Sequence, residues 1–331
     1  MRVVAVTGAT GFIGGHVVRR LVARGDRVIA FGRRAASELA DLSGVTYVRW
    51  RLPDALADPP DVDAVVHCAG TVTDWGPKSV FVRVNVEGTR RVLRTFASAR
   101  RFVHLSTASV YDPRASKRHV KEDAPYPDHY LNEYARSKML AELAVRDERP
   151  DAVILRPHAV YGPGDEKLLP RLLDARWFGT QLALGDGRNH VSVTHVDNLV
   201  CAIECAIDGS ASGTFNVADL VEPTVDDLLR AVLLDADLPV RIAYVPARLA
   251  WPVSTALESI ARVLGSRHPP RLTRYVVAQL TQEYTLDLSA AVERLGYRPV
   301  RTYLDGVRDG LVADALPRLM NHQESLGRQH V

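Results

Sequence analysis

A glycine-rich turn close to the N-terminus constrains the fold of this chain more than any other feature. Apolar residues from Val3 to Val6 predict a buried parallel strand, and apolar residues then recur at helical spacing from Ile13 to Val22. Gly8, Gly11 and Gly14 lie in the turn between them. Such glycines permit a tight reversal, a close backbone approach to a pyrophosphate and close packing of helix on strand. This unit predicts a parallel α/β sheet with a nucleotide cofactor at the start of its first helix.

The composition of the chain excludes several classes of protein. Its 331 residues, 47% of them hydrophobic, suffice for one large α/β domain and a smaller one. A net charge of only +3, with dispersed basic residues, argues against a nucleic-acid partner. Cys68, Cys201 and Cys205 lack metal-ligand spacing, so we expect reduced core thiols and no metal. The N-terminus enters a strand directly and no apolar stretch is long enough to span a bilayer, which predicts a cytoplasmic protein.

The rest of the chain predicts a sheet that a returning segment completes. Further strands are predicted at Arg27–Phe31, Val45–Trp50, Ala64–His67, Arg101–Leu105 and Ala152–Arg156, and helices at Phe81–Ser98 and Asn132–Arg149. After a loop and helix region from Gly162 to Leu184, strands at Val191–Val196 and Thr214–Val217 flank a helix started by Asp197. We therefore expect a cofactor domain of residues 1–156 with returning segments about 189–217, and a smaller, mostly helical substrate domain of residues 157–188 and 218–331.

The residues after the predicted second strand indicate which cofactor binds. Arg33 and Arg34 stand where an adenosine ribose would lie, and their guanidinium groups suit a 2′-phosphate. A carboxylate there would instead accept hydrogen bonds from a 2′-hydroxyl, so we expect NADP(H) rather than NAD(H). Two alternatives stay open. In the first alternative, both arginines are solvated loop residues. In the second, the glycine pattern is an ordinary turn, since its first gap is one residue longer than in the usual dinucleotide-binding fingerprint.

Hydroxyl groups and a phenol beside an ammonium predict where the reaction takes place. The fifth strand delivers Ser106 to Tyr111 to the carboxyl edge of the sheet, where doubly wound folds bind ligands and hydroxyls can meet a substrate carbonyl. Tyr134 and Lys138 are four residues apart on a predicted helix, so both side chains lie on one face. An adjacent ammonium stabilises a phenolate. We therefore expect Lys138 to lower the pKa of Tyr134, which would then act as a general acid or base.

The end of the predicted fourth strand has room for a bound cofactor. Cys68, Ala69 and Gly70 are small residues that follow this strand directly. His67 ends the apolar run, and we expect a packed or backbone-bonded histidine there rather than a catalyst.

The order of these motifs resembles that of the extended short-chain dehydrogenases/reductases over Val3 to Val312. The motifs that carry the resemblance are Thr7-Gly8-Ala9-Thr10-Gly11-Phe12-Ile13-Gly14, Asp63 to Gly70, Asn85 to Thr89, Thr107 to Tyr111, Tyr134 with Lys138, Leu155-Arg156-Pro157 and Tyr161-Gly162-Pro163-Gly164. The resemblance implies a Rossmann-type fold in which Thr107 hydrogen-bonds the substrate oxygen, Tyr134 transfers the proton, and Lys138 binds the nicotinamide ribose and tunes Tyr134.

The same resemblance implies a set of cofactor contacts and an assembly. The residues expected to contact the cofactor are Gly8, Thr10, Gly11, Phe12, Ile13, Gly14, Arg33, Arg34, Leu52, Ala69, Gly70, Tyr134, Lys138 and Pro157, the last of which would border the nicotinamide. Relatives commonly dimerise through the helices that here span Asn85 to Ala99 and Tyr134 to Glu148, which implies a homodimer.

Departures from the family pattern indicate which branch of the family this chain resembles. The family often has an acidic residue that contacts adenine where this chain reads Arg49-Trp50-Arg51-Leu52, and Asp112 replaces a usual glycine. Nucleotide-sugar epimerases and dehydratases usually place an arginine at the position of Val191 to grip a diphosphate, a contact that valine cannot make. The pattern around Val191, together with Leu272 to Tyr275 and Leu295 to Pro299, resembles the 3β-hydroxysteroid dehydrogenase-like branch, which includes bacterial reductases of 2-alkyl-3-keto acids.

One helix predicted in the C-terminal third has an apolar face with more than one interpretation. The residues that share this face are Leu249, Val253, Leu257, Ile260 and Leu264, with Glu258 and Arg262 on the other face. The apolar face either packs on the domain core or forms part of the entrance for a lipid-like substrate. Peripheral contact with a membrane is a third interpretation.

Taken together, these features predict an NADP(H)-dependent oxidoreductase. It would interconvert a ketone and a secondary alcohol on a mainly hydrophobic small molecule that is steroid-like, polyketide-like or a 2-alkyl-3-keto acid. The alternatives are a nucleotide-sugar epimerase or dehydratase that uses bound NAD, and a non-catalytic NADP-sensing module.

Overall fold

The computed structural model describes residues 1–34, 38–165, 168–173, 175–177, 179–266 and 268–308. Its centre is a seven-stranded sheet with the strand order β12-β7-β5-β4-β1-β2-β3. These strands are β1 (Val3–Thr7), β2 (Arg27–Gly32), β3 (Val45–Arg49), β4 (Ala64–His67), β5 (Arg101–Leu105), β7 (Val153–Pro157) and β12 (Gly213–Val217). All neighbouring pairs are parallel. The predicted doubly wound parallel sheet is therefore confirmed, and its nearly continuous apolar strands are typical of a sheet buried on both faces.

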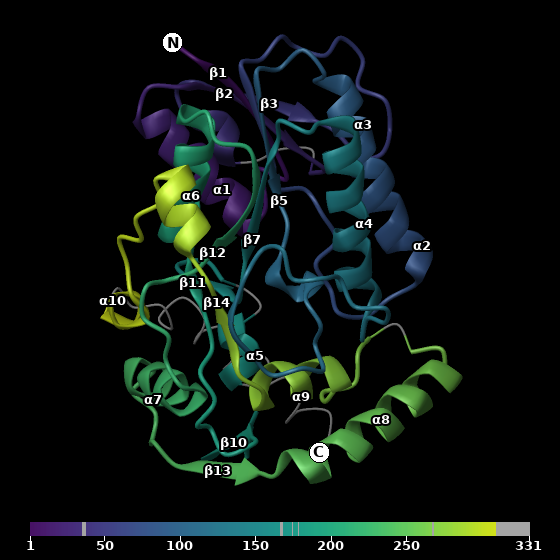
Figure 1. Cartoon of the computed structure of the whole chain (residues 1–331), viewed down its shortest axis with the longest axis vertical. Helices are drawn as coiled ribbons and strands as arrows, with labels where there is room; N and C mark the ends of the chain where they lie inside the picture. Colours follow the sequence, from purple (N-terminus) through teal and green to yellow (C-terminus); the bar gives the residue numbers. More distant parts are fainter. Residues whose placement is uncertain (35–37, 166–167, 174, 178, 267, 309–331) are drawn as a thin grey trace.

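Helices cover both faces of this sheet, as Figure 1 shows. One face carries α1 (Phe12–Ala23) and α6 (Val196–Asp208), which pack against each other. The other face carries α3 (Gly88–Thr95) and α4 (Glu133–Glu148), with the short α2 (Lys78–Phe81) beside them. After β7 the chain leaves the central sheet for a long segment. It then returns as β12, which pairs with β7 at the edge of the sheet.

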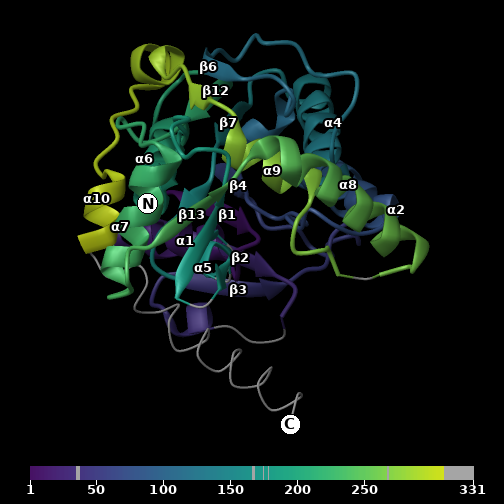
Figure 2. The same cartoon turned by 90° about the horizontal axis from the view of Figure 1, so that it is seen from below.

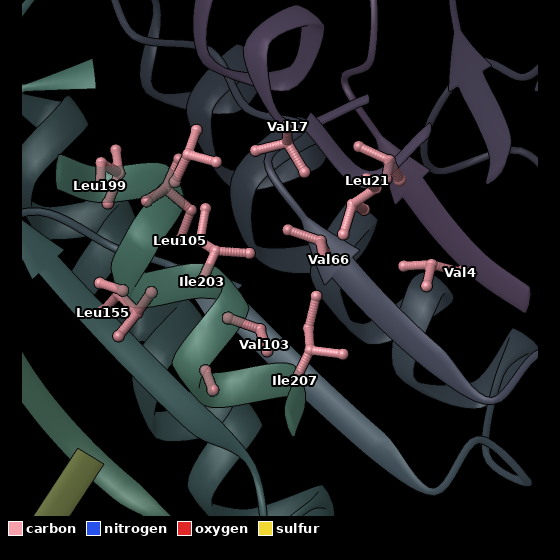
Figure 3. Close-up of a cluster of buried hydrophobic side chains, with 14 of the residues drawn as sticks. Val4, Val17, Leu21, Val66, Val103, Leu105, Leu155, Leu199, Ile203 and Ile207 are labelled. Carbon is pink, nitrogen blue, oxygen red and sulfur yellow. The ribbon is translucent and has the colours of Figure 1, made fainter. Parts of the chain in front are cut away.

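The core lies between the sheet and these two layers of helices. Figure 3 shows the layer under α1 and α6, where apolar side chains of the helices meet those of the central strands. The labelled side chains are Val17 and Leu21 of α1, Leu199, Ile203 and Ile207 of α6, and Val4, Val66, Val103, Leu105 and Leu155 of the strands. Burial of this apolar surface is the main source of the fold's stability.

Two predicted elements have different bounds in the structure. The helix expected at Phe81–Ser98 begins at Lys78, ends at Thr95, and contains a wider π-helical turn over Val82–Glu87. The strand expected at Val191–Val196 is reduced to β11 (Thr194–His195), which pairs with β8 (Val160–Tyr161). The following helix is capped by His195, whose Nδ1 accepts the N–H of Asp197 at 3.2 Å, so Asp197 lies in the first turn and does not start the helix.

A second, smaller part lies in the lower half of Figure 1. The region expected as loop and helix contains two strands that join a later one in a sheet of order β13-β10-β9. The strands of this part are β9 (Arg176–Trp177), β10 (Thr180–Leu184) and β13 (Ile242–Val245), with β14 (Tyr284–Leu286) paired to β6 (Lys117–Val120). Its helices are α5 (Leu168–Leu173), α7 (Val225–Asp235), α8 (Ala247–Val263), α9 (Arg274–Thr281) and α10 (Tyr303–Arg308).

The apolar face predicted for α8 does not pack on the core. Its leucine, valine and isoleucine side chains are exposed, whereas the buried positions of this helix are Ala250, Ser254 and Glu258. The interpretation in which this face packs on the domain core is therefore wrong. Within the described ranges, no helix combines the length and the apolar character that crossing a bilayer requires.

Candidate active site

The glycine turn brings the backbones of three segments into close contact. Gly8 has a φ of +69°, and a Cβ atom there would lie 2.7 Å from the backbone nitrogen of Ala69. A Cβ atom at Gly14 would collide with the carbonyl oxygen of Gly8. Gly11 is the N-cap of α1 and contributes no capping side chain, so the first N–H groups of this helix face the turn. This cradle of backbone donors fits the pyrophosphate of a dinucleotide.

The end of β2 lies against the same turn. A Cβ atom at Gly32 would lie 2.8 Å from the methyl group of Thr10, so the residue before Arg33 contacts the glycine turn directly. The Arg33 and Arg34 side chains are exposed, while their backbone carbonyls accept hydrogen bonds from Arg49 Nε at 3.3 Å and the Tyr47 hydroxyl at 2.7 Å. The backbone at this corner is thus held in place, and both arginine side chains are exposed to solvent.

Replacing Gly14 by alanine should disrupt this cradle. The added Cβ would displace the Gly8 carbonyl, so we expect the free energy of unfolding to fall by about 1–3 kcal/mol. Binding of the dinucleotide should weaken about tenfold or more, since each loss of about 1.4 kcal/mol in ligand contacts is a factor of ten. Denaturant unfolding and calorimetric titration measure the two effects. Gly15→Ala is the matched control, because its Cβ would meet the movable guanidinium of Arg19; an equal effect in both variants would contradict the prediction.

Leu52 and Trp50 occupy the corner where the family often has an adenine-binding acid. Trp50 is buried, with its ring 5.4 Å from that of Phe31 in an edge-on arrangement, so this position serves the core. Leu52 follows, and a Cβ atom at Gly88 would lie 3.2 Å from the Leu52 Cβ. An apolar leucine therefore lines this corner in place of a carboxylate.

His67 at the end of β4 is packed, as expected. Its Nδ1 lies 2.7 Å from the Thr7 hydroxyl and its Nε2 lies 3.0 Å from the Thr89 hydroxyl. The Thr89 hydroxyl donates to the Asn85 carbonyl, so it accepts from Nε2–H, and Nδ1 then accepts from Thr7. Burial, with a smaller effect of the Lys138 charge, lowers the pKa of His67 to about 3. This neutral histidine links β4 to Thr7 of β1 and to Thr89 of α3. Its hydrogen-bond partners are hydroxyl groups and not backbone groups.

Asn85 holds the loop after β4 against α4. Its side-chain oxygen accepts the N–H of Thr71 at 2.7 Å, and its amide nitrogen donates to the Thr71 carbonyl at 3.0 Å. The same nitrogen donates to the Ser137 hydroxyl at 2.8 Å. Because Ala69 and Gly70 precede Thr71, this bracing fixes the loop that faces Gly8 relative to the helix that carries the predicted Tyr134 and Lys138 pair.

The start of α4 positions Tyr134 and Lys138. Asn132 is the N-cap, and its side-chain oxygen accepts the N–H of Ala135 at 2.8 Å. Tyr134 therefore lies in the first turn and Lys138 one turn later. The Lys138 ammonium is buried and donates to the Leu105 carbonyl at the end of β5, at 2.6 Å. Burial lowers the pKa of Lys138 to about 8, against a smaller raising effect of Glu142.

The pKa of Tyr134 differs from the prediction. The ammonium was expected to lower it, whereas burial raises the pKa of this phenol above its ordinary value, and the nearby Tyr275 phenol raises it further. Only the Thr107 hydroxyl acts in the opposite direction, through a hydrogen bond. The physical reason is that the Lys138 ammonium points to the Leu105 carbonyl, so that desolvation of the phenol is the larger effect.

A line of hydroxyl groups leads from Thr107 to the C-terminal part of the chain. The Thr107 hydroxyl donates to the Ser109 hydroxyl at 3.0 Å and accepts the Ser109 N–H at 3.1 Å. The Ser109 hydroxyl lies 2.8 Å from the phenol of Tyr275, a residue of α9. The structure thus brings Thr107, Tyr134 and Tyr275 together. Sequence reasoning noted Tyr275 only as part of the Leu272 to Tyr275 pattern of the family branch. It missed the place of Tyr275 at the site, because that place depends on how a distant helix packs.

A buried ion pair lies behind the Tyr134 and Lys138 pair. The Glu142 carboxylate accepts from Arg156 Nη2 at 2.7 Å and from Arg156 Nε at 3.0 Å, and both side chains are at most 1% exposed. The Ser106 and Tyr126 hydroxyls donate to the same carboxylate. Glu142 follows Lys138 by one helical turn, and Arg156 precedes Pro157, so this pair ties α4 to the ends of β5 and β7. Sequence reasoning did not find it.

Pro157 ends β7 at the same edge of the sheet. Both ring nitrogens of the next residue, His158, make hydrogen bonds. His158 Nδ1 lies 2.6 Å from the Ser192 carbonyl, and its Nε2 lies 2.8 Å from the side-chain oxygen of Gln279 on α9. The imidazole also stacks on the Tyr284 ring at 4.3 Å. These contacts hold α9 against the carboxyl edge of the sheet, which is why Tyr275 reaches the site.

Comparison with known proteins identifies the family. Residues 4–218 match the model of the NAD dependent epimerase/dehydratase family. The chain is 32% identical to an uncharacterized protein, YbjS, of Escherichia coli, over 92% of this chain and 95% of that protein. It is 31% identical to a 2-alkyl-3-oxoalkanoate reductase of Shewanella oneidensis (92% and 84% covered) and 26% identical to a decarboxylating sterol-4-alpha-carboxylate 3-dehydrogenase of Mus musculus (91% and 88%).

Solved structures share the fold. The UDP-glucuronic acid 4-epimerase of Bacillus cereus, in complex with NAD, superposes with a TM-score of 0.71 at 21% identity, covering 92% of this chain and 96% of that one. DesIV, a dTDP-glucose 4,6-dehydratase of Streptomyces venezuelae, superposes with a TM-score of 0.72 at 26% identity, covering 98% of both chains. The chain therefore belongs to the NAD dependent epimerase/dehydratase family, that is, to the extended short-chain dehydrogenases/reductases, and its relatives include sterol dehydrogenases of the 3β-hydroxysteroid dehydrogenase-like branch.

Proposed function

We propose that this protein is an NADP(H)-dependent oxidoreductase that interconverts a ketone and a secondary alcohol. The observation that carries the proposal is the meeting of Thr107, Tyr134 and Lys138 at the carboxyl edge of the sheet. Strand and helix ends at this edge are where doubly wound folds bind ligands. The glycine cradle follows β1 of the same sheet, beside the site, and it fits the dinucleotide.

The residues of the site have separate tasks in the reduction. When bound, the nicotinamide supplies a hydride to the carbonyl carbon, which is chemistry that the protein side chains lack. Thr107, whose hydroxyl donates to Ser109 in the structure, would turn that proton toward the carbonyl oxygen of the substrate. Tyr134 would give the same oxygen a proton as its negative charge develops. The hydride and the proton together convert the ketone to the alcohol. Lys138, whose ammonium donates to the Leu105 carbonyl and stays charged below a pH of about 8, would bind the nicotinamide ribose of the cofactor.

We propose 2-alkyl-3-keto acids as the first substrates to test. The reductase relative from Shewanella oneidensis is named for this class of compound, and the match covers 92% of this chain. Val191 supports the choice, because it is buried in an apolar cluster with Val193 and Leu229 and offers no charge to a diphosphate. Steroid-like and polyketide-like ketones are the other members of the proposed substrate class.

The test is oxidation of NADPH by the purified protein in the presence of each ketone. We expect steady turnover with at least one 2-alkyl-3-keto acid, steroid ketone or polyketide-like ketone, followed as loss of NADPH absorbance. The alcohol product, identified by mass spectrometry, should carry deuterium when the cofactor is deuterated at C4. NADPH binding without turnover on any of these ketones would argue for a non-catalytic NADP-sensing module instead.

A nucleotide-sugar epimerase or dehydratase that uses bound NAD is the second candidate. The structures of the Bacillus cereus epimerase and of DesIV, both described with NAD, support it through their fold. The exposed Arg33 and the buried Val191 argue against it. Purified protein that carries one equivalent of NAD and acts on a UDP- or dTDP-sugar would establish this function in place of the ketone reductase.

Arg33 should determine the choice of cofactor. In an Arg33→Asp variant the guanidinium is lost and a carboxylate would face the 2′-phosphate of NADPH. We expect the ratio of NADPH to NADH affinity to fall about ten- to hundredfold, because hydrogen bonds to charged groups contribute about 1.5–3 kcal/mol. Titration with both cofactors measures the ratio. Arg27→Asp, an exposed arginine at the opposite end of β2, is the control and should leave the ratio unchanged.

We further propose an organisation for this enzyme. The cofactor domain would comprise residues 1–156 with the returning segments about 189–217, and the substrate domain residues 157–188 and 218–331. Two copies would pair through α3 and α4, where Leu143 of α4 is 44% exposed, as a cytoplasmic homodimer. Sedimentation of the purified protein tests the dimer.

A further inference from the structure

Helix α8 presents a row of large apolar side chains to solvent. This row, the α8 apolar stripe, consists of Leu249, Val253, Leu257, Ile260, Val263 and Leu264, whose exposed fractions run from 38% at Leu257 to 86% at Val263. In the sequence they look like the buried face of an amphipathic helix. In the structure they form a continuous exposed surface, which in a soluble protein marks an interaction site.

The stripe faces outward because another side of α8 makes the contacts with the protein. Ala250, Ser254 and Glu258 are the buried positions, and they follow one another at intervals of four on one side of the helix. Since successive residues are roughly 100° apart around a helix, this buried row lies about a quarter turn from the stripe. The packing of α8 against α9 therefore leaves the stripe uncovered.

The segment of the chain that carries the stripe is basic. Residues 246–282 contain five arginines and a single acidic residue, Glu258. That carboxylate is buried and accepts from Arg274 Nη2 at 2.9 Å and from Arg262 Nη2 at 3.2 Å, so it adds no negative charge to the surface. In the part of the chain that the structure describes, the exposed Arg248 and Arg271 pair with no carboxylate. The segment that carries the stripe thus has a net positive charge, and two of its exposed arginines are not neutralised by a carboxylate of the described residues.

The position of α8 makes the stripe accessible. The helix lies along the edge of the molecule in both views (Figures 1 and 2). Its far end is held to the body by Trp75, whose indole N–H donates to the Ser266 carbonyl at 3.0 Å. The Arg262 guanidinium lies over the same indole ring, 5.6 Å from its centre. These contacts hold the stripe in a fixed orientation.

We propose that the α8 apolar stripe lies on an anionic lipid surface and makes this protein a peripheral membrane protein. The apolar side chains would enter the boundary between headgroups and acyl chains, and Arg248 and Arg271 would contact lipid phosphates, as in other interfacial helices. A second copy of the chain is a poorer occupant. A two-fold contact would place the same basic segment against itself, and like charges repel. This inference does not depend on the proposed reaction.

The test is flotation of the full-length protein with vesicles of phosphatidylcholine alone and of phosphatidylcholine mixed with phosphatidylglycerol. We expect binding to the mixed vesicles, weaker binding to phosphatidylcholine alone, and a decline as salt is added. Ile260→Glu should weaken binding about tenfold or more, because it puts a charge into the apolar boundary. Replacing Arg248 and Arg271 by glutamine should weaken binding to the mixed vesicles about fivefold for each arginine, with little effect on phosphatidylcholine.

Val300→Glu is the matched control. Val300 is 64% exposed, close to the 56% of Ile260, and its backbone bonds to Asn198 of α6, on the side of the molecule away from α8 in both views. This variant should bind vesicles like the unaltered protein, and circular dichroism should show both variants folded. The proposal is overturned if the unaltered protein floats with neither vesicle, or if Val300→Glu loses as much binding as Ile260→Glu. A dimer that Ile260→Glu dissociates, without vesicle binding, would identify a second copy as the occupant.

Discussion

Replacing Tyr134 by phenylalanine should lower kcat for ketone reduction by about a hundred- to ten-thousandfold, the usual range for loss of a general acid. The phenyl ring keeps the packing of the first turn of α4 but has no proton to give to the carbonyl oxygen. NADPH affinity should change little, because the variant removes one hydroxyl of the expected cofactor contacts and leaves the glycine cradle that fits the pyrophosphate intact. Steady-state kinetics with a confirmed ketone substrate, together with an NADPH titration, measures both quantities.

Tyr130→Phe is the control for this variant. Tyr130 lies four residues earlier and its hydroxyl donates to the Val110 carbonyl at 3.1 Å, so it serves the backbone of the same region. We expect kcat in Tyr130→Phe to stay within a few fold of the unaltered enzyme, in keeping with the loss of one neutral hydrogen bond of about 1 kcal/mol. A folded Tyr134→Phe variant that binds NADPH and reduces the ketone at full rate would refute the proposed mechanism.

Replacing Glu142 by leucine should be the most destabilising single change in this region. The variant would leave the Arg156 guanidinium buried without its carboxylate, and breaking a buried ion pair in this way costs about 3–5 kcal/mol. The Ser106 and Tyr126 hydroxyls would lose an acceptor as well. The free energy of unfolding, measured with denaturant by circular dichroism, should fall by this amount.

Two further variants separate the charge effect from simple loss of a side chain. Glu148→Leu, at the last residue of the same helix, removes a carboxylate whose partners Arg90 and Arg94 are exposed, and should cost at most about 1 kcal/mol. In the double variant Glu142→Leu with Arg156→Leu the uncompensated charge is gone, so part of the lost stability should return. If Glu142→Leu were no worse than Glu148→Leu, the buried pair would not have the energetic role assigned here.

The same ion pair predicts how stability depends on pH. Burial by itself raises the pKa of Glu142, but the hydrogen bonds and charge of Arg156 are together stronger and hold the pKa below its ordinary value of 4.5. The stabilising effect of the carboxylate is therefore complete above that value and is lost as pH falls further, through the pKa of the folded state. Unfolding free energy of the unaltered protein should fall more steeply in this acidic range than that of the double variant.

The glycine turn and the strands of the central sheet could be predicted from the sequence, since their signals are local. The order of these strands in the sheet was not predicted, because it depends on which distant segments pair. Apolar runs of four or five residues with glycine or polar ends identify the strands, and the positions of Gly8 and Gly14 identify the close approach of backbones that the structure contains. The strand expected at Val191–Val196 is divided, because Val191 forms a bridge with Tyr284 and only Thr194 and His195 pair with the distant strand β8. The strand β9 was missed because it has only two residues. The strand β10 was missed because its polar Gln181 is buried and its apolar Leu182 is exposed, which is the reverse of the pattern that predicts a strand.

The candidate site was predicted in part. The i, i+4 spacing of Tyr134 and Lys138 follows from helix geometry, which neighbouring residues determine. The direction of the Tyr134 pKa shift could not be predicted, because it depends on how much protein covers the phenol and on where the Lys138 ammonium points. Tyr275 reaches Ser109 only because α9 packs on the edge of the sheet.

By itself, the sequence determined the doubly wound sheet, the cofactor cradle and the spacing of the Tyr134 and Lys138 pair. These features rest on hydrophobic periods and backbone requirements that act over a few residues. Only the tertiary structure decided that Glu142 and Arg156 are buried together and that the apolar face of α8 turns to solvent. The physical reason is that burial and electrostatic pairing depend on which distant segments pack against a side chain, and the spacing of residues along one helix contains no such information.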